Sequence, residues 1–392
     1  MHETFRLGRI AGVRVGANWT VLVIAFLIAW TLATQLLPSA APDRPVVEYW
    51  GAGAIAALLF FLSLLAHELA HAIQARREGL EVDGITLWLL GGVAQLKGEA
   101  KTPGAEARIA GVGPLVSILL GAAFGLSALA AQHLGLPVLV VAASAWLGGI
   151  NLVLGVFNLL PGAPLDGGRL LRAIIWRWKG DALRATRVAT AIGRGMGMAL
   201  IAFGVLELVA GQDLGGIWTV VLGFFLMNAA TMESSQALMV DALRDVPVRA
   251  VMDDGLLRVP GGLRLDTFAA QVAMAQRASA YLVAGPGGEI LGVVLLAQVG
   301  RIPPGERRER RLEEIALPIA AVPSAGPDEL VTSVLERQVP GTLGVLVIEA
   351  GLPIGFLGPR EVNDAVEKAR LVGGGGARKG GLDRRTGAHR PS

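Results

Sequence analysis

Six long apolar segments dominate the N-terminal part of the sequence and limit how it can fold. Each is long enough, or nearly so, to cross the hydrocarbon core of a bilayer, which is about 30 Å thick. Lipid offers no partner for backbone N–H and C=O groups, so such segments fold as helices that satisfy these groups internally. With 53% hydrophobic residues, the composition agrees with a polytopic α-helical membrane protein and excludes an ordinary soluble protein. The expected spans are residues 17–37, 51–73, 109–132, 136–160, 188–210 and 214–230.

Basic residues are unevenly distributed among the connections between these segments. They gather in residues 1–16, after the second span and after the fourth, whereas the other short connections hold only Arg44. Since Lys and Arg accumulate on the cytoplasmic side of membrane proteins, both termini are expected in the cytoplasm. The net charge of +3 therefore reflects topology, and we expect no nucleic-acid partner.

The second apolar segment ends in His67-Glu68-Leu69-Ala70-His71, toward the cytoplasmic leaflet. Positions four apart share a helix face, so the two imidazoles can bind one cation while Glu68 takes a proton from its bound water. The chain has no cysteine, so a transition-metal site must be built from His and carboxylate. The alternative is a helix end whose polar residues face lipid headgroups, but ionisable residues within a span are costly and usually mark function.

A second informative stretch, residues 158–168, ends the fourth span. Its two prolines and three glycines break the helix on the cytoplasmic side, which is where the topology places the His pair. Asp166 therefore reaches the depth at which a third ligand is missing. Two His and one carboxylate leave a fourth position open, as in catalytic zinc sites. Taken alone, the stretch fits equally well a turn in which Asp166 caps a helix over residues 169–178.

Two stretches near the His pair carry weaker signals. Residues 84–96 are too short and too broken by Gly91-Gly92 for a span, which suggests a hairpin dipping toward the membrane; an amphipathic linker remains an open alternative. Residues 110–114, rich in small side chains, predict close helix packing around the centre.

Three polar residues lie inside the last two spans: Arg194, Glu207 and Asn228. They fit a gate or a substrate contact, but hydrogen bonds between helices and contacts with headgroups are commoner explanations. The sequence assigns them no role.

The chain resembles the site-2 protease family of intramembrane zinc metalloproteases in four motifs and in their order along the sequence. These motifs are residues 67–71, 91–92, 110–114 and 158–168. The resemblance covers roughly residues 1–235 and includes Leu165-Asp166-Gly167. It implies that His67, His71 and Asp166 bind one Zn²⁺ per chain, that Glu68 is the general acid/base, and that Asn158 helps to hold the substrate carbonyl or its oxyanion. It also implies that an edge of the hairpin pairs with an extended substrate strand.

From about residue 241 the composition turns soluble and an internal repeat appears. Residues 281–284 and 287–292 match residues 344–347 and 351–355, each copy a strand, a turn and a strand. A helical stretch precedes each copy, starting near Asp266 or Asp328. The pair resembles a tandem cystathionine-β-synthase-type (CBS) module, and residues 248–252 resemble its entry.

Modules of this type often bind adenine nucleotides between the copies. They typically offer Ser or Thr and a ribose-binding Asp after the second strand, but here residues 296–299 read Leu-Ala-Gln-Val and residues 358–361 read Gly-Pro-Arg-Glu. This departure argues against an adenine-nucleotide cofactor. A homodimer contact or a substrate-docking platform needs no ligand.

The expected organisation is a cytoplasmic segment (1–16), a six-helix membrane domain with an associated β-hairpin (17–236), an α+β tandem CBS-type domain (241–367) and a disordered tail (371–392). The predicted protein is a zinc endopeptidase of the cell membrane that cuts in or near transmembrane segments of membrane-anchored regulators. By resemblance, its substrates are proteins such as anti-sigma factors or pro-proteins. The competing class is a CBS-regulated transporter or channel, which needs polar residues spread along several spans, whereas here they gather at one depth.

Overall fold

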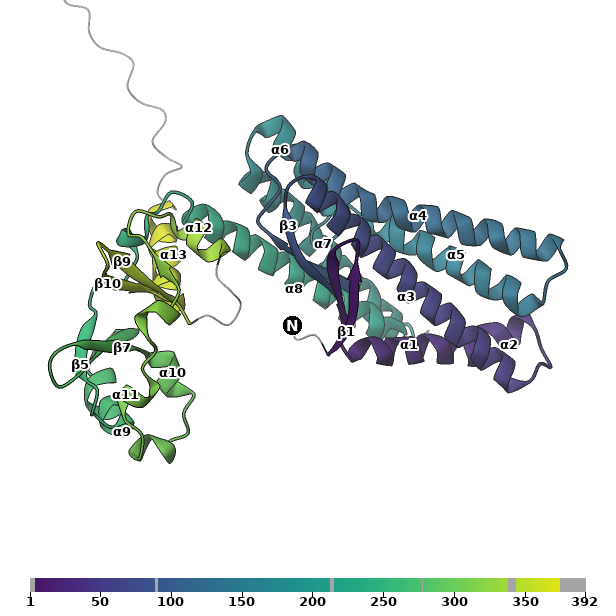
Figure 1. Ribbon diagram of the computed structural model, residues 1–392. Coiled ribbons are helices and arrows are strands. Elements are labelled where there is room, and N and C mark those ends of the chain that lie inside the picture. Colours follow the sequence, from purple (N-terminus) through teal and green to yellow (C-terminus); the bar gives the residue numbers. More distant parts are fainter. Residues whose placement is uncertain (1–3, 89–90, 212–214, 277, 338–342, 374–392) are drawn as a thin grey trace, which may run out of the picture. The chain divides into compact units, whose positions relative to one another are not determined.

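The computed structural model describes residues 4–88, 91–211, 215–276, 278–337 and 343–373 (Figure 1). The chain divides into two compact units, Met1–Ala237 and Leu238–Ser392. The first carries the apolar helices and the second carries the sequence repeat. Of the tail predicted over residues 371–392, the part from residue 374 onward lies outside the described residues.

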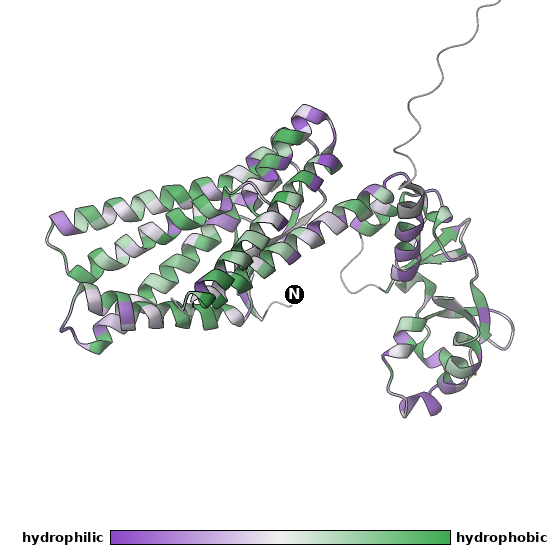
Figure 2. Ribbon diagram, turned by 180° about the vertical axis from the view of Figure 1, so that it is seen from behind, coloured by the Kyte–Doolittle hydropathy of each residue, from purple (hydrophilic) through white to green (hydrophobic). Residues whose placement is uncertain are grey.

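Long apolar helices build the first unit. Within the described residues, six helical segments are long and apolar enough to cross a membrane, and Figure 2 shows hydrophobic residues along them. This confirms the predicted fold class. Each apolar segment predicted from the sequence overlaps one of these helices. They are α1 (Thr20–Thr31), which continues through η1 (Leu32–Leu36) into α2 (Leu37–Ala40), then α3 (Val46–Arg77), α4 (Pro103–His133), α5 (Val138–Asn158), α7 (Ala182–Val209) and α8 (Gly215–Ala242); the shorter α6 (Asp166–Lys179) lies between α5 and α7.

Small residues set how closely the helices approach. A Cβ placed on Gly204 of α7 would lie 2.6 Å from the carbonyl oxygen of Gly216 on α8, and a Cβ on Gly223 would lie equally close to that of Gly197. Because nothing larger fits there, the two backbones pack directly against each other, as is typical of membrane helices. Elsewhere in this unit α4 and α5 lie side by side (Figure 1).

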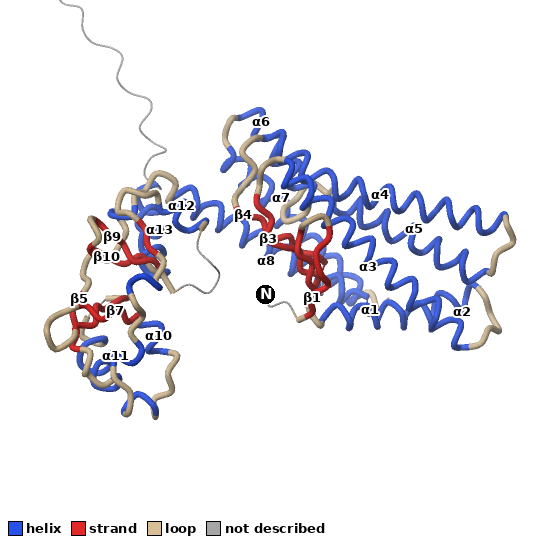
Figure 3. The backbone as a smooth tube through the Cα atoms, in the orientation of Figure 1, coloured by secondary structure: helices blue, strands red, loops and turns tan. Residues whose placement is uncertain are grey.

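A four-stranded sheet accompanies the helices of the first unit, drawn in red in Figure 3. The strands β1 (Phe5–Ile10), β2 (Val13–Ala17), β3 (Glu81–Trp88) and β4 (Gly91–Lys97) lie in sequence order, with β2 and β3 parallel and the other neighbours antiparallel. Val13 and Ile85 of the sheet pack against Leu64 and Ala72 of α3 in one apolar cluster. The sheet therefore rests on the helix that carries the His pair, with β1 and β4 at its edges.

The sheet shows which structure residues 84–96 adopt, and it contains strands that were not predicted. Between the second and third spans the chain forms the β3–β4 hairpin, so the amphipathic-linker interpretation is wrong. Strand β3 ends at Trp88 and β4 begins at Gly91, so Gly91-Gly92 belongs to a strand. Residues 1–16 were expected only as a cytoplasmic segment, yet β1 and most of β2 lie there and extend the sheet.

The second unit contains the predicted repeat. Strand β5 (Leu257–Pro260) pairs in parallel with β6 (Ala280–Ala284), which pairs antiparallel with β7 (Ile290–Leu295). Strands β8 (Ser324–Ala325), β9 (Val345–Glu349) and β10 (Leu352–Leu357) repeat this connectivity. The short helices are η2 (Val248–Ala250), α9 (Leu265–Thr267), η3 (Phe268–Ala273), α10 (Leu296–Gly300), η4 (Glu306–Arg308), α11 (Leu312–Ile315), η5 (Ile319–Ala321), α12 (Val331–Glu336) and α13 (Pro359–Gly373).

One apolar cluster joins the two copies of the repeat. It includes Leu282 and Val293 from the first sheet, and Leu346 and Phe356 from the second, all nearly inaccessible to solvent. The two sheets therefore pack on each other inside the second unit, which is the α+β tandem arrangement that the sequence predicts.

Candidate metal centre

The two histidines of α3 lie on one face of the helix and are nearly inaccessible to solvent. The Nδ1 atom of His67 lies 2.9 Å from Ser117 Oγ, and the Nδ1 atom of His71 lies 2.6 Å from the carbonyl oxygen of Ile109. A carbonyl only accepts hydrogen bonds, so the proton of a neutral His71 is on Nδ1 and Nε2 carries the lone pair. The two Nε2 atoms are 3.1 Å apart.

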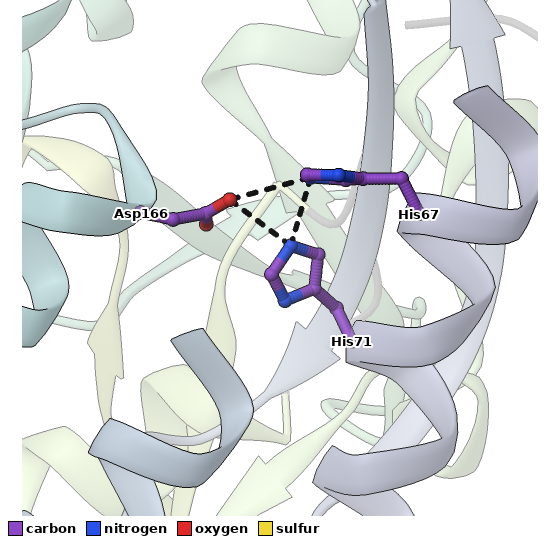
Figure 4. A group of neighbouring side chains, drawn as sticks. All are labelled: His67, His71 and Asp166. Carbon is purple, nitrogen blue, oxygen red and sulfur yellow. Dashed lines mark hydrogen bonds and ion pairs between the residues drawn. The ribbon is translucent and has the colours of Figure 1, made fainter. Parts of the chain in front are cut away.

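Asp166, the first residue of α6, faces both imidazoles (Figure 4). Its Oδ2 atom lies 3.3 Å from His67 Nε2 and 3.1 Å from His71 Nε2. Zinc bonds of about 2.0–2.1 Å in a tetrahedral site separate neighbouring donor atoms by about 3.3 Å. The three donors thus have the spacing and the chemistry of a catalytic zinc site, and the residues fit the ion.

The local sequence explains why α6 starts at Asp166. Leu165 is the N-cap, with extended backbone angles and no side-chain cap, so Asp166 does not cap the helix as the alternative interpretation required. A Cβ on Gly167 would lie 2.2 Å from the carbonyl oxygen of Leu159, so the chain from α5 folds directly back over the start of α6. That close return needs glycine and fixes where Asp166 enters the site.

Electrostatics favour the ionised form of Asp166. Burial alone would raise the pKa of its carboxyl group, but the adjacent imidazoles of His67 and His71 favour the ionised form and hold the pKa well below its ordinary value. The negative charge at the first position of α6 is also favourable for the helix dipole. The carboxylate is therefore available as a ligand.

Glu68 lies between the His pair and the edge of the sheet. Its carboxylate interacts electrostatically with His71 and Asp166 and accepts a backbone hydrogen bond from Gly92 of β4. A Cβ on Gly92 would lie 2.3 Å from Glu68 Cγ, so only glycine leaves room for this side chain. The predicted base is thus next to both the ligand cluster and strand β4.

Among the described residues, the Asn158 side chain makes no hydrogen bond or ion pair with this cluster. It ends α5, and its Nδ2 donates to the carbonyl oxygen of Leu154 on its own helix. Of the polar residues in the last spans, Glu207 accepts a hydrogen bond from Thr219 of α8, and Asn228 donates to Phe224. The first contact joins α7 to α8, and the second lies within α8.

One residue at the centre of the site, Gly113 of α4, was not predicted as part of it. A Cβ at this position would lie 2.1 Å from His71 Nε2 and 2.8 Å from His67 Nε2. The α4 backbone therefore forms one wall of the space in which the donor atoms meet. The small residues of 110–114 were the available signal, but sequence alone did not show which of them faces the imidazoles.

We expect Gly113→Ala to lose bound zinc and hydrolysis together, because the added methyl group displaces both Nε2 atoms. Gly111→Ala is the matched control on the same helix, since a Cβ there meets only Leu170 Cδ2 at 3.7 Å. Zinc content can be measured by mass spectrometry on both purified variants. A wild-type zinc content in Gly113→Ala would show that this wall does not border the site.

Several known proteins are similar to this chain. The family model of peptidase family M50 matches residues 55–136 and 131–202. The chain is 43% identical over 376 residues, covering 95% of both chains, to a Mycobacterium tuberculosis protein named "Putative zinc metalloprotease Rip3". Among solved structures it is similar to the site-2 protease of Methanocaldococcus jannaschii, at 29% identity and a TM-score of 0.41, over 59% of this chain and 94% of that one. It is also similar to the CBS domain of a bacterial CNNM/CorC family Mg²⁺ transporter, at 19% identity and a TM-score of 0.27, over 37% of this chain and 93% of that domain.

Proposed function

Because this chain belongs to peptidase family M50, the site-2 family of intramembrane zinc metalloproteases, we propose that it cuts membrane-anchored regulatory proteins in or near their transmembrane segments. Family membership implies Zn²⁺ and a multi-pass location in a membrane. It does not favour the alternative of a CBS-regulated transporter or channel. The observation that carries the proposed site is the convergence of three donor atoms from α3 and α6, all within 4.8 Å of one another.

The proposed ligands are His67 Nε2, His71 Nε2 and the carboxylate of Asp166, for one Zn²⁺ per chain. Zinc bound there supplies Lewis acidity, which polarises the scissile carbonyl group and makes water a stronger acid. The contacts of Ser117 with His67 and of Ile109 with His71 orient the rings, as outer-shell partners of metal-binding histidines do.

Glu68 is the proposed general base and acid. Its carboxylate takes a proton from the attacking water and returns it to the leaving amine of the cut peptide bond. The hydrogen bond from Gly92 keeps this carboxylate beside β4. Asn158 is proposed to donate an amide N–H to the substrate carbonyl oxygen, since its Nδ2 carries two N–H groups and the hydrogen bond to Leu154 uses one.

Strand β4 is the proposed docking edge for substrate. It is the last strand of the sheet, so its outer edge can pair with an extended segment, and its residue Gly92 touches Glu68. A transmembrane helix hides its carbonyl groups in its own hydrogen bonds and must unwind before hydrolysis. Pairing with β4 would replace those bonds while presenting a peptide bond to Glu68. The proposed substrate class is that of anti-sigma factors and pro-proteins.

We further propose that both termini and the CBS-type unit lie in the cytoplasm. The basic residues of 1–16 and of the connections after α3 and α5 support this orientation by the positive-inside rule. It places the start of α6, and with it Asp166, at the cytoplasmic side.

The proposed role of the CBS-type unit is assembly into a homodimer or substrate docking, without a nucleotide. The acidic position after β10 supports this: Glu361 already accepts hydrogen bonds from Ser279 Oγ at 2.6 Å and from the Gly358 amide at 2.9 Å. A ribose would have to displace these internal donors.

Removal of the metal tests the proposed function. We expect 1,10-phenanthroline to abolish cleavage of a membrane-anchored model substrate by the detergent-purified protein, and about one equivalent of Zn²⁺ to restore it. The zinc content of each sample is to be measured by mass spectrometry. Full cleavage by protein shown to be free of metal would contradict the proposal.

A further inference from the structure

An ionic cluster with a buried pair at its centre lies outside the metal centre and joins α4 to α6. Arg172 of α6 places Nη1 3.2 Å from Glu106 Oε1 and Nη2 2.7 Å from Glu99 Oε2. Arg169 lies 3.9 Å from the same oxygen of Glu106. The Glu106 side chain is only 1% exposed. The proposed hydrolysis uses none of these four residues.

The cluster and the metal centre share the same two helices, and on α4 they share one face. On α4, Glu106, Ile109 and Gly113 follow one another at intervals of three and four, which place them on one face. Ile109 receives the hydrogen bond of His71, and Gly113 borders both imidazoles. On α6, Asp166 and Arg172 are six residues apart, about 1.7 turns, so they point in different directions around the helix, and the distance between them along the axis is what relates them.

The distance between the cluster and the metal centre is similar along the two helices. At 1.5 Å per residue, Glu106 and Gly113 are separated by about 10 Å along α4, and Asp166 and Arg172 by about 9 Å along α6. A pair that joins Glu106 to Arg172 therefore brings Asp166 level with Gly113, where the imidazoles are. A slip of one turn between the helices would move the carboxylate by about 5 Å and remove it from the site.

Stability alone does not explain the cluster. Burying two opposite charges costs as much as their attraction returns in many proteins, so a buried ion pair is weak evidence for stability. Within the described part of the chain, Glu106 Oε2 and Arg172 Nε are buried without a hydrogen-bond partner. Glu233 of α8 adds another carboxylate in electrostatic range of both arginines. A role in positioning the helices explains why the free-energy cost of burying this ion pair is tolerated.

We propose that the Glu106–Arg172 pair is a positioning element that sets the depth of Asp166 against the His pair. The proposal rests on the proposed function, since it takes Asp166 as a zinc ligand. Arginine suits the role because its planar fork engages two carboxylates in fixed directions. The second carboxylate that Arg172 contacts belongs to Glu99, two residues after the end of β4. The Arg172 side chain therefore also links the proposed substrate-docking strand to α6.

The test compares Arg172→Lys and Glu106→Gln with Arg108→Gln in full-length protein purified in detergent. Zinc affinity is to be measured by competition with a chromogenic chelator, and kcat and KM with a membrane-anchored substrate. We expect both cluster variants to lose about 10–100-fold in zinc affinity, as for lost outer-shell contacts. Their kcat at limiting zinc falls while KM stays. Arg108→Gln breaks an exposed pair with Glu78 on other faces and is expected to keep wild-type affinity.

A double variant separates positioning from plain stability. Glu106→Leu with Arg172→Met replaces the charges by apolar side chains, a change that is often neutral or stabilising for a buried pair. We expect its thermal stability to recover while its zinc affinity remains low. Wild-type zinc affinity in Arg172→Lys and Glu106→Gln, or an equal loss in Arg108→Gln, would overturn the proposal. Absence of zinc from the wild-type protein would instead contradict the proposed function.

Discussion

Glu68→Gln is expected to abolish peptide-bond hydrolysis while leaving the zinc content unchanged. Glutamine has nearly the same shape but cannot take the proton from water, and a general base contributes about 10²–10⁴-fold to rate. We therefore expect kcat to fall by at least about 10²-fold. Zinc stays because Glu68 is adjacent to the ligand cluster but is not one of the three residues whose donor atoms converge.

A matched control for this variant lies on the same helix. Glu48 is exposed in the first turn of α3, at the opposite end from the His pair, and Glu48→Gln should cleave substrate like the wild type. Both variants are to be assayed with one membrane-anchored substrate, with zinc measured on the same preparations. Retained cleavage by Glu68→Gln would remove the residue from its proposed role.

Asp166→Asn is expected to lose both zinc and hydrolysis. The substitution keeps the size of the side chain but removes the negative charge that lies 3.1 and 3.3 Å from the two imidazoles. Because a ligand itself is weakened, zinc affinity should fall by more than the roughly 10–100-fold typical of an outer-shell change. Competition with a chromogenic chelator measures this directly.

Asp181→Asn controls for the loss of an acidic residue near a helix start. Asp181 caps α7 through the amide of Arg184, and asparagine is an equally good N-cap, so stability, zinc and activity should persist. If Asp166→Asn bound zinc as tightly as Asp181→Asn does, the third ligand would have to be another group.

Local patterns in the sequence predicted much of this molecule. The length of the apolar segments predicted the six membrane spans, because a bilayer allows few other structures. The spacing of His67 and His71 predicted that both side chains lie on one face of a helix, because the helix repeat does not depend on the rest of the fold. The pairing with Asp166, 95 residues after His71 in the sequence, followed from topology, since both motifs end spans on the same side of the membrane.

Other features depend on which backbones meet, and sequence alone could not give them. Gly113 looked like a general packing residue, and only its register against α3 shows that its Cα faces both imidazoles. The N-terminal hairpin owes its place to pairing between β2 and β3, which are separated by two membrane helices. Likewise, nothing local marks Glu106 as the partner of Arg172, because each looks like an ordinary charge at a membrane boundary.

The central claim is that two histidines of α3 and the first residue of α6 bind one zinc ion. X-ray absorption at the zinc edge of the purified wild-type protein tests it most directly. We predict about one zinc per chain, with a shell of nitrogen and oxygen at about 2.0–2.2 Å and outer scattering from two imidazoles. A protein that binds no zinc, or a spectrum without imidazole scattering, would contradict this account.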